Sequence, residues 1–183
     1  MIQTRRLTLR PMVREDTGIY CEICRQVDTP GVASLLQDPA AAEAVKEILW
    51  NELDRENRLN MLILRKDTDT VCGQICMQET DREAPEIGID IVPEWQDIGY
   101  GPEAVRAFAK WYAQTYGTGT FTVCIAKDNT HSRHVFEKLG AVYQGDRCVF
   151  SEDYMAALRE SLPCAEVERL ASARVDVFTL TAD

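Results

Sequence analysis

The first half of the chain switches between the hydrophobic periods of a strand and of a helix. Apolar and polar residues alternate over residues 4–10, which predicts a strand that Pro11 ends, because proline cannot donate to a sheet ladder. Acidic residues at positions 15 and 16 open a helical stretch that reaches residue 26. A second helix is expected from residue 38 to about residue 58, because an Asp-Pro pair precedes an apolar rhythm of helical period.

Three β-rich runs follow and predict an antiparallel meander. They cover residues 61–65, 71–78 and 86–92. A polar cluster at 66–70 and a loop at 80–85 separate them, and such segments are typical of turns between sequence-adjacent strands.

The second half of the chain alternates helix and strand. Apolar residues at i, i+3, i+4 and i+7 follow Pro102 and stop at Gly117, which predicts a helix that ends in a left-handed glycine. The same spacing precedes Gly140. In chain order we expect a helix from 102, a strand over 121–126, a helix over 132–139, a strand from 141, helical residues over 151–172 and a final strand over 175–180.

Strand and helix runs are mixed, with no linker or repeat between them. We therefore expect one domain over residues 1–183, of α/β (α+β) class, around a central mixed sheet. Of the 183 residues, 45% are apolar, but no apolar run approaches the roughly 20 residues that span a bilayer. Residues 1–10 lack the apolar block of a secretory signal. These observations predict a cytoplasmic protein without a membrane span.

The net charge of the chain limits the classes of partner that it is expected to bind. Twenty Lys and Arg face 30 Asp and Glu, which gives a formal net charge of −10. Such a surface repels phosphate backbones and disfavours nucleic acid as a partner. It attracts cations such as amines, although a purely solubilising surface explains the same charge.

Seven cysteines do not form the pattern of a disulfide framework, because their number is odd and most stand alone in apolar runs. Cys21 and Cys24 spell C-x-x-C, but no second such pair and no His pair completes a tetrahedral metal set. We interpret the two as neighbours on a helix and expect no metal site.

The most informative stretch joins the strand at 86–92 to the helix at Pro102 through a turn that contains Gly99 and Gly101. Free amides at a helix start form an anion site together with the helix dipole, and glycines can adopt positive φ and let a phosphate approach the backbone. A plain strand-to-helix turn is the simpler alternative.

A dinucleotide-binding turn is a second alternative. Gly99, Gly101 and Ala104 spell G-x-G-x-x-A, and Asp128 follows a later strand. In that fold the first glycine follows the strand almost at once, whereas residues 93–98 intervene here. The fingerprint also belongs after the first strand of a parallel sheet, whereas in this chain a predicted antiparallel meander precedes the two glycines.

Gln96-x-x-Gly99-x-Gly101 resembles the coenzyme A motif of the GCN5-related N-acetyltransferase (GNAT) superfamily. The resemblance extends to the RimJ/RimL-like branch through the opening strand at 4–11, through Glu86-Ile87-Gly88 with Pro93-Glu94, and through residues 129–141. It covers about residues 4–150 in the right order and implies a central, mostly antiparallel sheet flanked by helices.

The resemblance also implies ligand roles. Acetyl-CoA would be the co-substrate, and the backbone of Ile91 and Val92 would pair with its pantetheine arm. Asn129 would hydrogen-bond the pantetheine or thioester region, and Ser132 would lie near the sulfur or bond to its own helical turn. The pyrophosphate would be held by the amides of the segment Gln96, Asp97, Ile98, Gly99, Tyr100 and Gly101.

Three features depart from the family pattern. Pro102 lacks the N–H that many relatives have at this helix start. Asp97 and Ile98 stand where a glycine and a basic residue are common, which predicts weaker coenzyme A binding. Phe136 occupies the place of a tyrosine proposed as general acid in many relatives.

Amide formation needs a neutral amine, so an ammonium substrate must first lose a proton. Glu86, at the start of the strand that leads to the coenzyme, is our first candidate for the base, although an ordinary strand-end glutamate is equally compatible with its position. Asp90 faces the same side of the strand and is the second candidate. His131 and His134 are less favoured alternatives.

The resemblance therefore implies an acetyl-CoA dependent N-acetyltransferase. Its acceptor would be a primary amine of a protein N-terminus or of a small molecule, and a homodimer is compatible with the resemblance. The altered turn and the missing tyrosine keep a second hypothesis open, a non-catalytic acyl-CoA binding or sensory module.

Overall fold

The computed structural model describes residues 1–27, 39–149, 159 and 164–182. The chain forms two compact units. The N-terminal unit comprises Met1–Phe121 with Thr181–Asp183, and the C-terminal unit comprises Thr122–Leu180. The expectation of a single domain over residues 1–183 stays a prediction.

The strands of the N-terminal unit form the predicted antiparallel meander. Each strand pairs with the next one in the sequence, and all four pairings are antiparallel. The strands are β1 (Ile2–Gln3), β2 (Leu7–Pro11), β3 (Arg58–Arg65), β4 (Val71–Gln78) and β5 (Glu86–Ile91).

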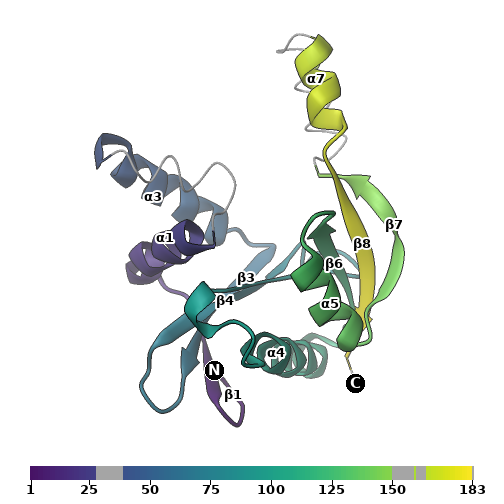
Figure 1. Cartoon of the computed structure of the whole chain (residues 1–183). Helices are drawn as coiled ribbons and strands as arrows, with labels where there is room; N and C mark the ends of the chain where they lie inside the picture. The colour runs from purple at the N-terminus through teal and green to yellow at the C-terminus, as the bar shows by residue number, and fades with distance from the viewer. Residues whose placement is uncertain (28–38, 150–158, 160–163, 183) are drawn as a thin grey trace. The chain divides into compact units, whose positions relative to one another are not determined.

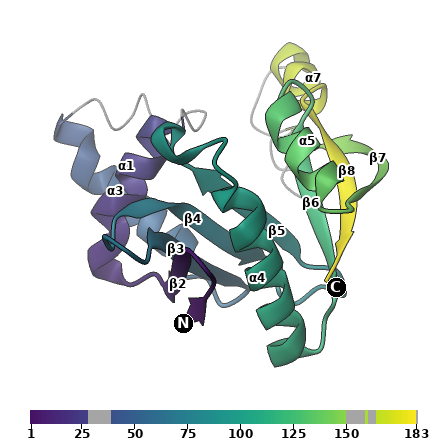
Figure 2. The same cartoon turned by 60° about the horizontal axis from the view of Figure 1, so that its bottom comes forward.

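Helices cover both faces of this sheet. α1 and α3 lie on one face and α4 lies on the other (Figure 1 and Figure 2). A short 3-10 turn precedes α1, and another follows β5. The bounds are η1 (Arg14–Asp16), α1 (Thr17–Gln26), α3 (Pro39–Leu53), η2 (Pro93–Trp95) and α4 (Tyr100–Tyr116).

Strand alternation assigns residues to the two faces. Leu62 pairs with Gln74, and Gln74 pairs with Asp90, so these three side chains share a face. Ile23 of α1 packs against Leu62 on that face. The opposite parity carries fully buried apolar residues such as Ile75 of β4, and the side of the sheet toward α4 is therefore core.

The C-terminal unit is a second αβ assembly in which β8 lies between β6 and β7, and β7 and β8 are antiparallel. Arg133 of α5 forms an ion pair with the buried Asp176 of β8, and its guanidinium lies 5.4 Å from the ring centre of Phe178. These contacts attach α5 to the strands. The elements are β6 (Thr120–Ala126), α5 (Thr130–Lys138), β7 (Val142–Cys148), α7 (Cys164–Ala171) and β8 (Arg174–Thr181).

Two predicted boundaries are wrong. The strand expected over residues 4–10 begins only at Leu7, because the chain turns before it and the Thr4 N–H donates to the Leu7 carbonyl at 2.9 Å. The helix expected to reach residue 58 ends at Leu53, and the strand expected at 61 begins at Arg58. Asn60 is the physical reason, because its buried side-chain amide donates to the carbonyl of Leu53 at 2.7 Å and satisfies an acceptor that the helix end leaves open. Arg58 in turn donates to the Asn60 side chain at 2.9 Å.

Two predicted elements fall partly outside the described residues. Asp38, expected to cap the second helix, lies outside them, and of the helical stretch at 151–172 only residue 159 and residues 164–172 lie inside. None of the helices within the described ranges has the length and apolar character needed to cross a membrane.

Candidate active site

A glycine-containing turn connects β5 to α4 in the N-terminal unit; we call residues 96–101 the glycine turn. Val92 extends β5 by donating its N–H to the carbonyl of Cys72 at 2.9 Å. The 3-10 turn η2 follows, and Gly99 then forms the N-cap of α4 with φ of 82°. Asp97 also has a positive φ of 59°. Two of the three residues before the helix, Asp97 and Gly99, therefore have a left-handed backbone conformation.

The glycine turn exposes a row of amide donors. Within the described ranges, no hydrogen-bond acceptor is found for the N–H groups of Ile98, Gly99, Tyr100 and Gly101. The first amides of a helix have no partner inside the helix, and the helix dipole adds positive potential at the same place. This arrangement suits an anion with several oxygens, such as a phosphate group.

The two glycines of the turn meet different demands. Gly99 has a left-handed φ, and a Cβ there would lie 3.3 Å from the Arg6 Nη2 atom. Gly101 lies inside the first helical turn without a positive φ, and a Cβ there would only contact Ile91 Cγ1 at 3.8 Å. A glycine at 101 is therefore not required by the protein's own packing.

The backbone expected to pair with pantetheine already has partners. The Ile91 carbonyl accepts from the Gln96 side chain at 2.7 Å. The Val92 carbonyl accepts from the Trp95 N–H at 2.9 Å, and the Val92 N–H bonds to β4. Pairing of Val92 with a ligand would have to share or replace these bonds, and this role of Ile91 and Val92 stays a prediction.

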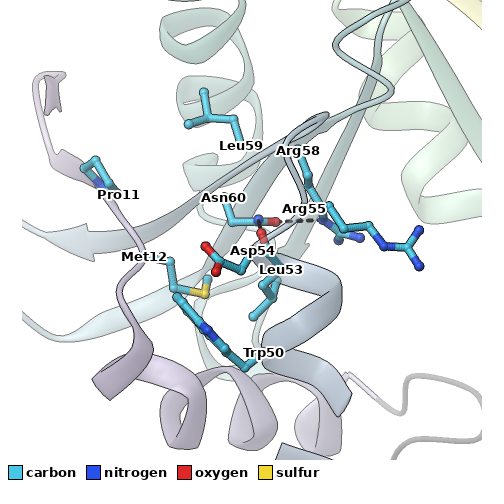
Figure 3. Close-up of a pocket in the computed structure, with 9 residues that line it drawn as sticks. All are labelled: Pro11, Met12, Trp50, Leu53, Asp54, Arg55, Arg58, Leu59 and Asn60. Carbon is cyan, nitrogen blue, oxygen red and sulfur yellow. Dashed lines mark hydrogen bonds between the residues drawn. The ribbon is translucent and has the colours of Figure 1, made fainter. Parts of the chain in front are cut away.

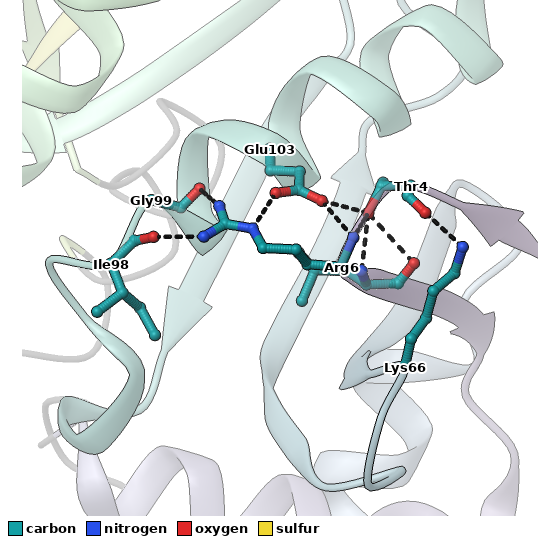
Figure 4. A network of polar contacts seen from close by, with 7 residues as sticks. Thr4, Arg6, Lys66, Ile98, Gly99 and Glu103 are labelled. Carbon is teal, nitrogen blue, oxygen red and sulfur yellow. Dashed lines mark hydrogen bonds and ion pairs between the residues drawn. The ribbon is translucent and has the colours of Figure 1, made fainter.

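Arg6 and Glu103 connect the N-terminal segment to the glycine turn (Figure 4). The Arg6 guanidinium donates to the carbonyl of Ile98 at 2.8 Å and to that of Gly99 at 3.1 Å. Its Nε atom lies 2.7 Å from Glu103 in the first turn of α4. A positive charge therefore lies beside the turn although position 98 itself is apolar.

Two aromatic rings form part of the same structure. Trp95 and Tyr100 are stacked with ring centres 6.4 Å apart. The Arg65 guanidinium lies 4.6 Å from the Trp95 ring centre, and that of Arg6 lies 4.8 Å from the Tyr100 ring centre. Cations in these positions are attracted by the faces of the rings, so two arginines help to hold the turn in place.

The candidate bases Glu86 and Asp90 lie on the α1 face of β5, in register with Gln78 and Gln74 respectively. Gln74 donates to the Asp90 carboxylate at 2.7 Å. Gln74 is 4% exposed, and within the described residues its Oε1 atom has no hydrogen-bond partner. A buried acceptor of this kind is costly to leave unpaired and is available to a ligand donor.

Burial raises the pKa of the Asp90 carboxyl above its ordinary value, against the hydrogen bond from Gln74 and the positive charge of Arg58, which lower it. A carboxylate with a raised pKa holds a proton more strongly than an exposed one. Asp90 is therefore better suited than an exposed carboxylate to accept a proton near neutral pH.

A cavity of about 150 Å³ is lined in part by the start of β3, where Arg58 is in register with Gln78 and Gln78 with Glu86 (Figure 3). Trp50 and Met12 form an apolar part of its wall, and Arg58 belongs to its rim. It is lined by Pro11, Met12, Trp50, Leu53, Asp54, Arg55, Arg58, Leu59 and Asn60. The guanidinium whose charge acts on Asp90 thus also borders a cavity.

In the C-terminal unit, Asn129 is the N-cap of α5. Its side-chain oxygen accepts from the Ser132 N–H at 3.0 Å. Ser132 is half-buried, and Phe136 on the same helix is buried at 3% exposure. Asn129 therefore has a capping role that the sequence analysis did not assign to it, and Phe136 is a core residue.

No disulfide joins the cysteines in the described ranges, and Cys21 and Cys24 are buried on α1. Over the described ranges, no three His, Cys, Asp or Glu side chains cluster as metal ligands would. The interpretation of the C-x-x-C pair as helical neighbours agrees with their position.

Arg6, Glu103, Arg58 and Gln74 are the site residues that the sequence analysis missed. Arg6 lay within the opening segment used for the resemblance, but no local pattern connects it to Glu103, which is 97 positions away. Gln74 and Arg58 are polar residues in strands, and a single-sequence pattern does not distinguish a buried polar residue from an exposed one.

The chain matches the family model of the acetyltransferase (GNAT) domain over residues 6–142. It is 25% identical over 148 residues to an uncharacterized N-acetyltransferase, p20, of Bacillus licheniformis. That match covers 79% of this chain and 83% of the relative.

Solved structures show the same fold. A chimera of the spermidine N-acetyltransferase SpeG of Vibrio cholerae and hSSAT aligns with a TM-score of 0.68 at 14% identity, covering 96% of this chain and 95% of the other. A GNAT-family acetyltransferase of Bacillus anthracis aligns with a TM-score of 0.64 at 16% identity, covering 98% and 97%. The expected α/β class with a mostly antiparallel sheet is confirmed. The antiparallel pairing of β4 with β5 also argues against a dinucleotide-binding turn of the parallel-sheet type.

Proposed function

The chain belongs to the GNAT acetyltransferase family, and on this premise we propose that it transfers an acetyl group from acetyl-CoA to a primary amine. The observation that carries the proposal is the row of amides at Ile98, Gly99, Tyr100 and Gly101, which lack acceptors among the described residues. Together with Gln96 and Asp97 they form the turn that would hold the pyrophosphate. Acetyl-CoA is a co-substrate in this proposal.

The chemistry is direct attack within a ternary complex. The amine nitrogen forms a bond to the thioester carbon, the carbon–sulfur bond breaks, and coenzyme A leaves as a thiolate that takes up a proton. The ammonium form of the acceptor must first give a proton to a base. We propose Glu86 as that base, with Asp90, which is half-buried and accepts a hydrogen bond from the buried Gln74, as the alternative.

The family resemblance assigns ligand roles to two residues of the α5 segment. We propose that Asn129, besides capping α5, hydrogen-bonds the pantetheine or thioester region, and that Ser132 lies near the leaving sulfur. The family resemblance supports both assignments. The capping bond occupies only the side-chain oxygen of Asn129 in the described contacts, and a ligand would use the amide nitrogen.

The acceptor is proposed to be a cationic amine, with a small molecule tested before a protein N-terminus. The net charge of −10 and the carboxylates of Glu86 and Asp90 on one strand face favour a positively charged substrate. One structural neighbour derives from a spermidine N-acetyltransferase, which makes polyamines a reasonable first group to test. A cytoplasmic location and a homodimer stay predictions.

A non-catalytic acyl-CoA binding module is the second candidate. Two observations favour it. Pro102 removes one donor at the start of α4. Phe136 lies in the core, so its position supplies no tyrosine hydroxyl to protonate the leaving thiolate.

The deciding experiment combines binding with turnover. Calorimetry with acetyl-CoA and an assay of thiol release over a panel of polyamines, amino sugars and N-terminal peptides should give binding and amine-dependent release. Binding without release from any amine would favour the non-catalytic module. No binding at all would contradict both candidates.

Gly101→Val is the matched variant, because a Cβ at 101 would contact only Ile91 in the protein, at 3.8 Å, while the branched side chain would obstruct a phosphate at the amides. Acetyl-CoA affinity should fall by about tenfold or more, with the melting temperature of the free protein near that of the wild type. Unchanged affinity would reject the glycine turn as the pyrophosphate site.

A further inference from the structure

Arg6 does more than add positive charge to the glycine turn. We infer that it is a positioning residue for the diphosphate of acetyl-CoA, because it holds two successive carbonyl groups and thereby aims two successive amides at the ligand. The inference rests on the proposed function and assigns a role to a residue far from the coenzyme A motif in sequence. Figure 4 shows the contacts from which it is built.

The geometry of the peptide bond makes the connection. In a trans peptide the C=O and N–H groups point in opposite directions, and the described chain contains no cis peptide. The carbonyl of Ile98 belongs to the same peptide as the N–H of Gly99, and the carbonyl of Gly99 to that of Tyr100. Since the guanidinium of Arg6 donates to both carbonyl oxygens, both amides are directed away from Arg6.

Glu103 keeps the guanidinium in place. It accepts from the Arg6 Nε at 2.7 Å and from the Arg6 backbone N–H at 2.9 Å. Thr4 donates to the same carboxylate at 2.5 Å. Burial raises the pKa of Glu103, but the hydrogen bonds from Thr4 and Arg6 outweigh this effect and hold the pKa below its ordinary value. The carboxylate is therefore ionised at neutral pH and anchors Arg6 fully.

The ion pair also reduces the electrostatic repulsion between Glu103 and a bound diphosphate. A carboxylate in the first turn of α4 would repel a diphosphate bound at the same helix start. The Arg6 guanidinium compensates this charge while it holds the turn. Lysine cannot do the same, because an ammonium is a point charge without the planar fork that serves two carbonyls and a carboxylate together.

Arg6→Lys is therefore the central test, with two acyl donors. Acetyl-CoA contains the diphosphate, whereas S-acetylpantetheine lacks it. We expect the KM for acetyl-CoA to rise by about tenfold while kcat stays within about twofold of the wild type. The value of kcat/KM for S-acetylpantetheine should stay within about twofold, because that donor does not use the amides that Arg6 positions.

Arg10→Lys is the matched control. Arg10 is four residues further along the same segment and also makes a two-pronged ion pair, with Asp16 at 2.6 and 2.7 Å, but it does not contact the glycine turn. Its replacement should lower the melting temperature without changing the ratio of kcat/KM for the two donors. Glu103→Gln is a second variant, which should raise the KM for acetyl-CoA while sparing S-acetylpantetheine, because it loosens the anchor of Arg6.

Each outcome bears on the inference. An equal loss with both donors in Arg6→Lys would make Arg6 a purely structural residue and overturn it, as would an unchanged KM for acetyl-CoA. Calorimetry of the wild-type protein separates this failure from that of the proposed function. Wild-type binding of acetyl-CoA with no effect of Arg6→Lys overturns this inference alone, whereas no wild-type binding overturns both.

Discussion

Gly99 and Gly101 are two residues apart, yet the structure requires glycine at only one of them. Gly99 holds a φ of 82°, where an L side chain is strained, and a Cβ there would also crowd Arg6 at 3.3 Å. Gly101 has helical geometry, and a Cβ there would make only an ordinary contact with Ile91 Cγ1 at 3.8 Å. Under the proposed function, a sequence motif that contains both glycines combines a conformational requirement at Gly99 with a requirement set by the ligand at Gly101.

Replacing each glycine by alanine should separate the two requirements. Gly99→Ala is expected to lower the free energy of unfolding by about 1 to 2 kcal/mol, the cost of a left-handed conformation in a residue with a Cβ. Gly101→Ala should raise it by up to about 1 kcal/mol, because alanine is the better helix former. Urea unfolding of the ligand-free variants measures both, and equal effects at the two positions would contradict the assigned backbone geometry.

Asp90 provides a second test at the scale of one residue, through stability. Burial raises its pKa in the folded chain above the ordinary value that it has when unfolded. As pH rises from the ordinary pKa to the raised one, the unfolded state loses its proton first, so the free energy of unfolding falls. Asp90→Asn cannot ionise and should be more stable than the wild type at neutral pH.

The difference in the free energy of unfolding between Asp90→Asn and the wild type should therefore depend on pH. The gain should disappear as pH falls below the ordinary carboxyl pKa, where both proteins carry a neutral side chain. Urea unfolding of both proteins at neutral and acidic pH measures this difference in the free energy of unfolding. A variant that is less stable than the wild type at neutral pH would show that the carboxylate is held by favourable contacts rather than strained by burial.

Substitutions of Glu86 and Asp90 on β5 test which of the two residues is the catalytic base. Glu86→Gln keeps the side-chain shape but cannot take up a proton, so turnover of an accepted amine should fall by roughly 10² to 10⁴ with little change in coenzyme affinity. The loss should shrink at high pH, where free amine is already present. If Glu86→Gln retains turnover over about pH 6 to 9 and Asp90→Asn does not, the base is Asp90 and Glu86 is structural.

Among the elements, those with a strong hydrophobic period were predicted closely. β4 matches its expected bounds at Val71–Gln78, and α4 ends before Gly117, whose φ of 78° is that of a left-handed cap. The boundary between α3 and β3 was missed because Arg58 and Asn60 are polar residues that face the α1 side of the sheet. Their burial is a tertiary effect, and no glycine or proline marks the end of the helix in this stretch.

In the candidate site, too, the local features could be predicted from the sequence and the long-range contacts could not. The glycine turn could be predicted because its residues are contiguous and its chemistry is local to a strand, a turn and a helix start. The bonds from Arg6 to Ile98, Gly99 and Glu103 could not, because they join positions more than 90 residues apart. Gln74 and Asp90 belong to different strands, and only the register of β4 and β5 brings them together.

Helix α5 allows capping and ligand binding to be separated at Asn129. Asn129→Ala should lower the free energy of unfolding by about 1 kcal/mol, because the Ser132 N–H loses its acceptor. Asn129→Asp keeps an oxygen for the cap and should retain near wild-type stability. If the amide nitrogen also binds pantetheine, Asn129→Asp should still raise the KM for acetyl-CoA by about tenfold. Wild-type kinetics in Asn129→Asp would leave capping as the residue's role.

For the molecule as a whole, a ligand raises stability only through the folded state that binds it. The net charge of −10 opposes an anionic ligand at long range, so the local amides and arginines must supply the attraction. Binding of acetyl-CoA would therefore show that the attraction from the local amides and arginines exceeds the repulsion from the overall negative charge. The effect of overall charge should weaken with salt, since exposed charges are screened beyond about 10 Å at 0.1 M ionic strength.

Thermal unfolding with different nucleotides tests the choice of ligand on the intact chain. At a concentration about 100 times its Kd, acetyl-CoA should add about 2.7 kcal/mol and raise the melting temperature by roughly 5 to 10 °C for a chain of this size. NAD and NADP should cause no shift, because the glycine turn follows an antiparallel strand and not the first strand of a parallel sheet. If the glycine turn holds the diphosphate as proposed, Gly101→Val should abolish the acetyl-CoA shift, while the ligand-free melting temperature stays close to that of the wild type because a Cβ at 101 makes only an ordinary contact with Ile91. A shift with NAD and none with acetyl-CoA would assign the amides to a dinucleotide and reverse the ligand assignment.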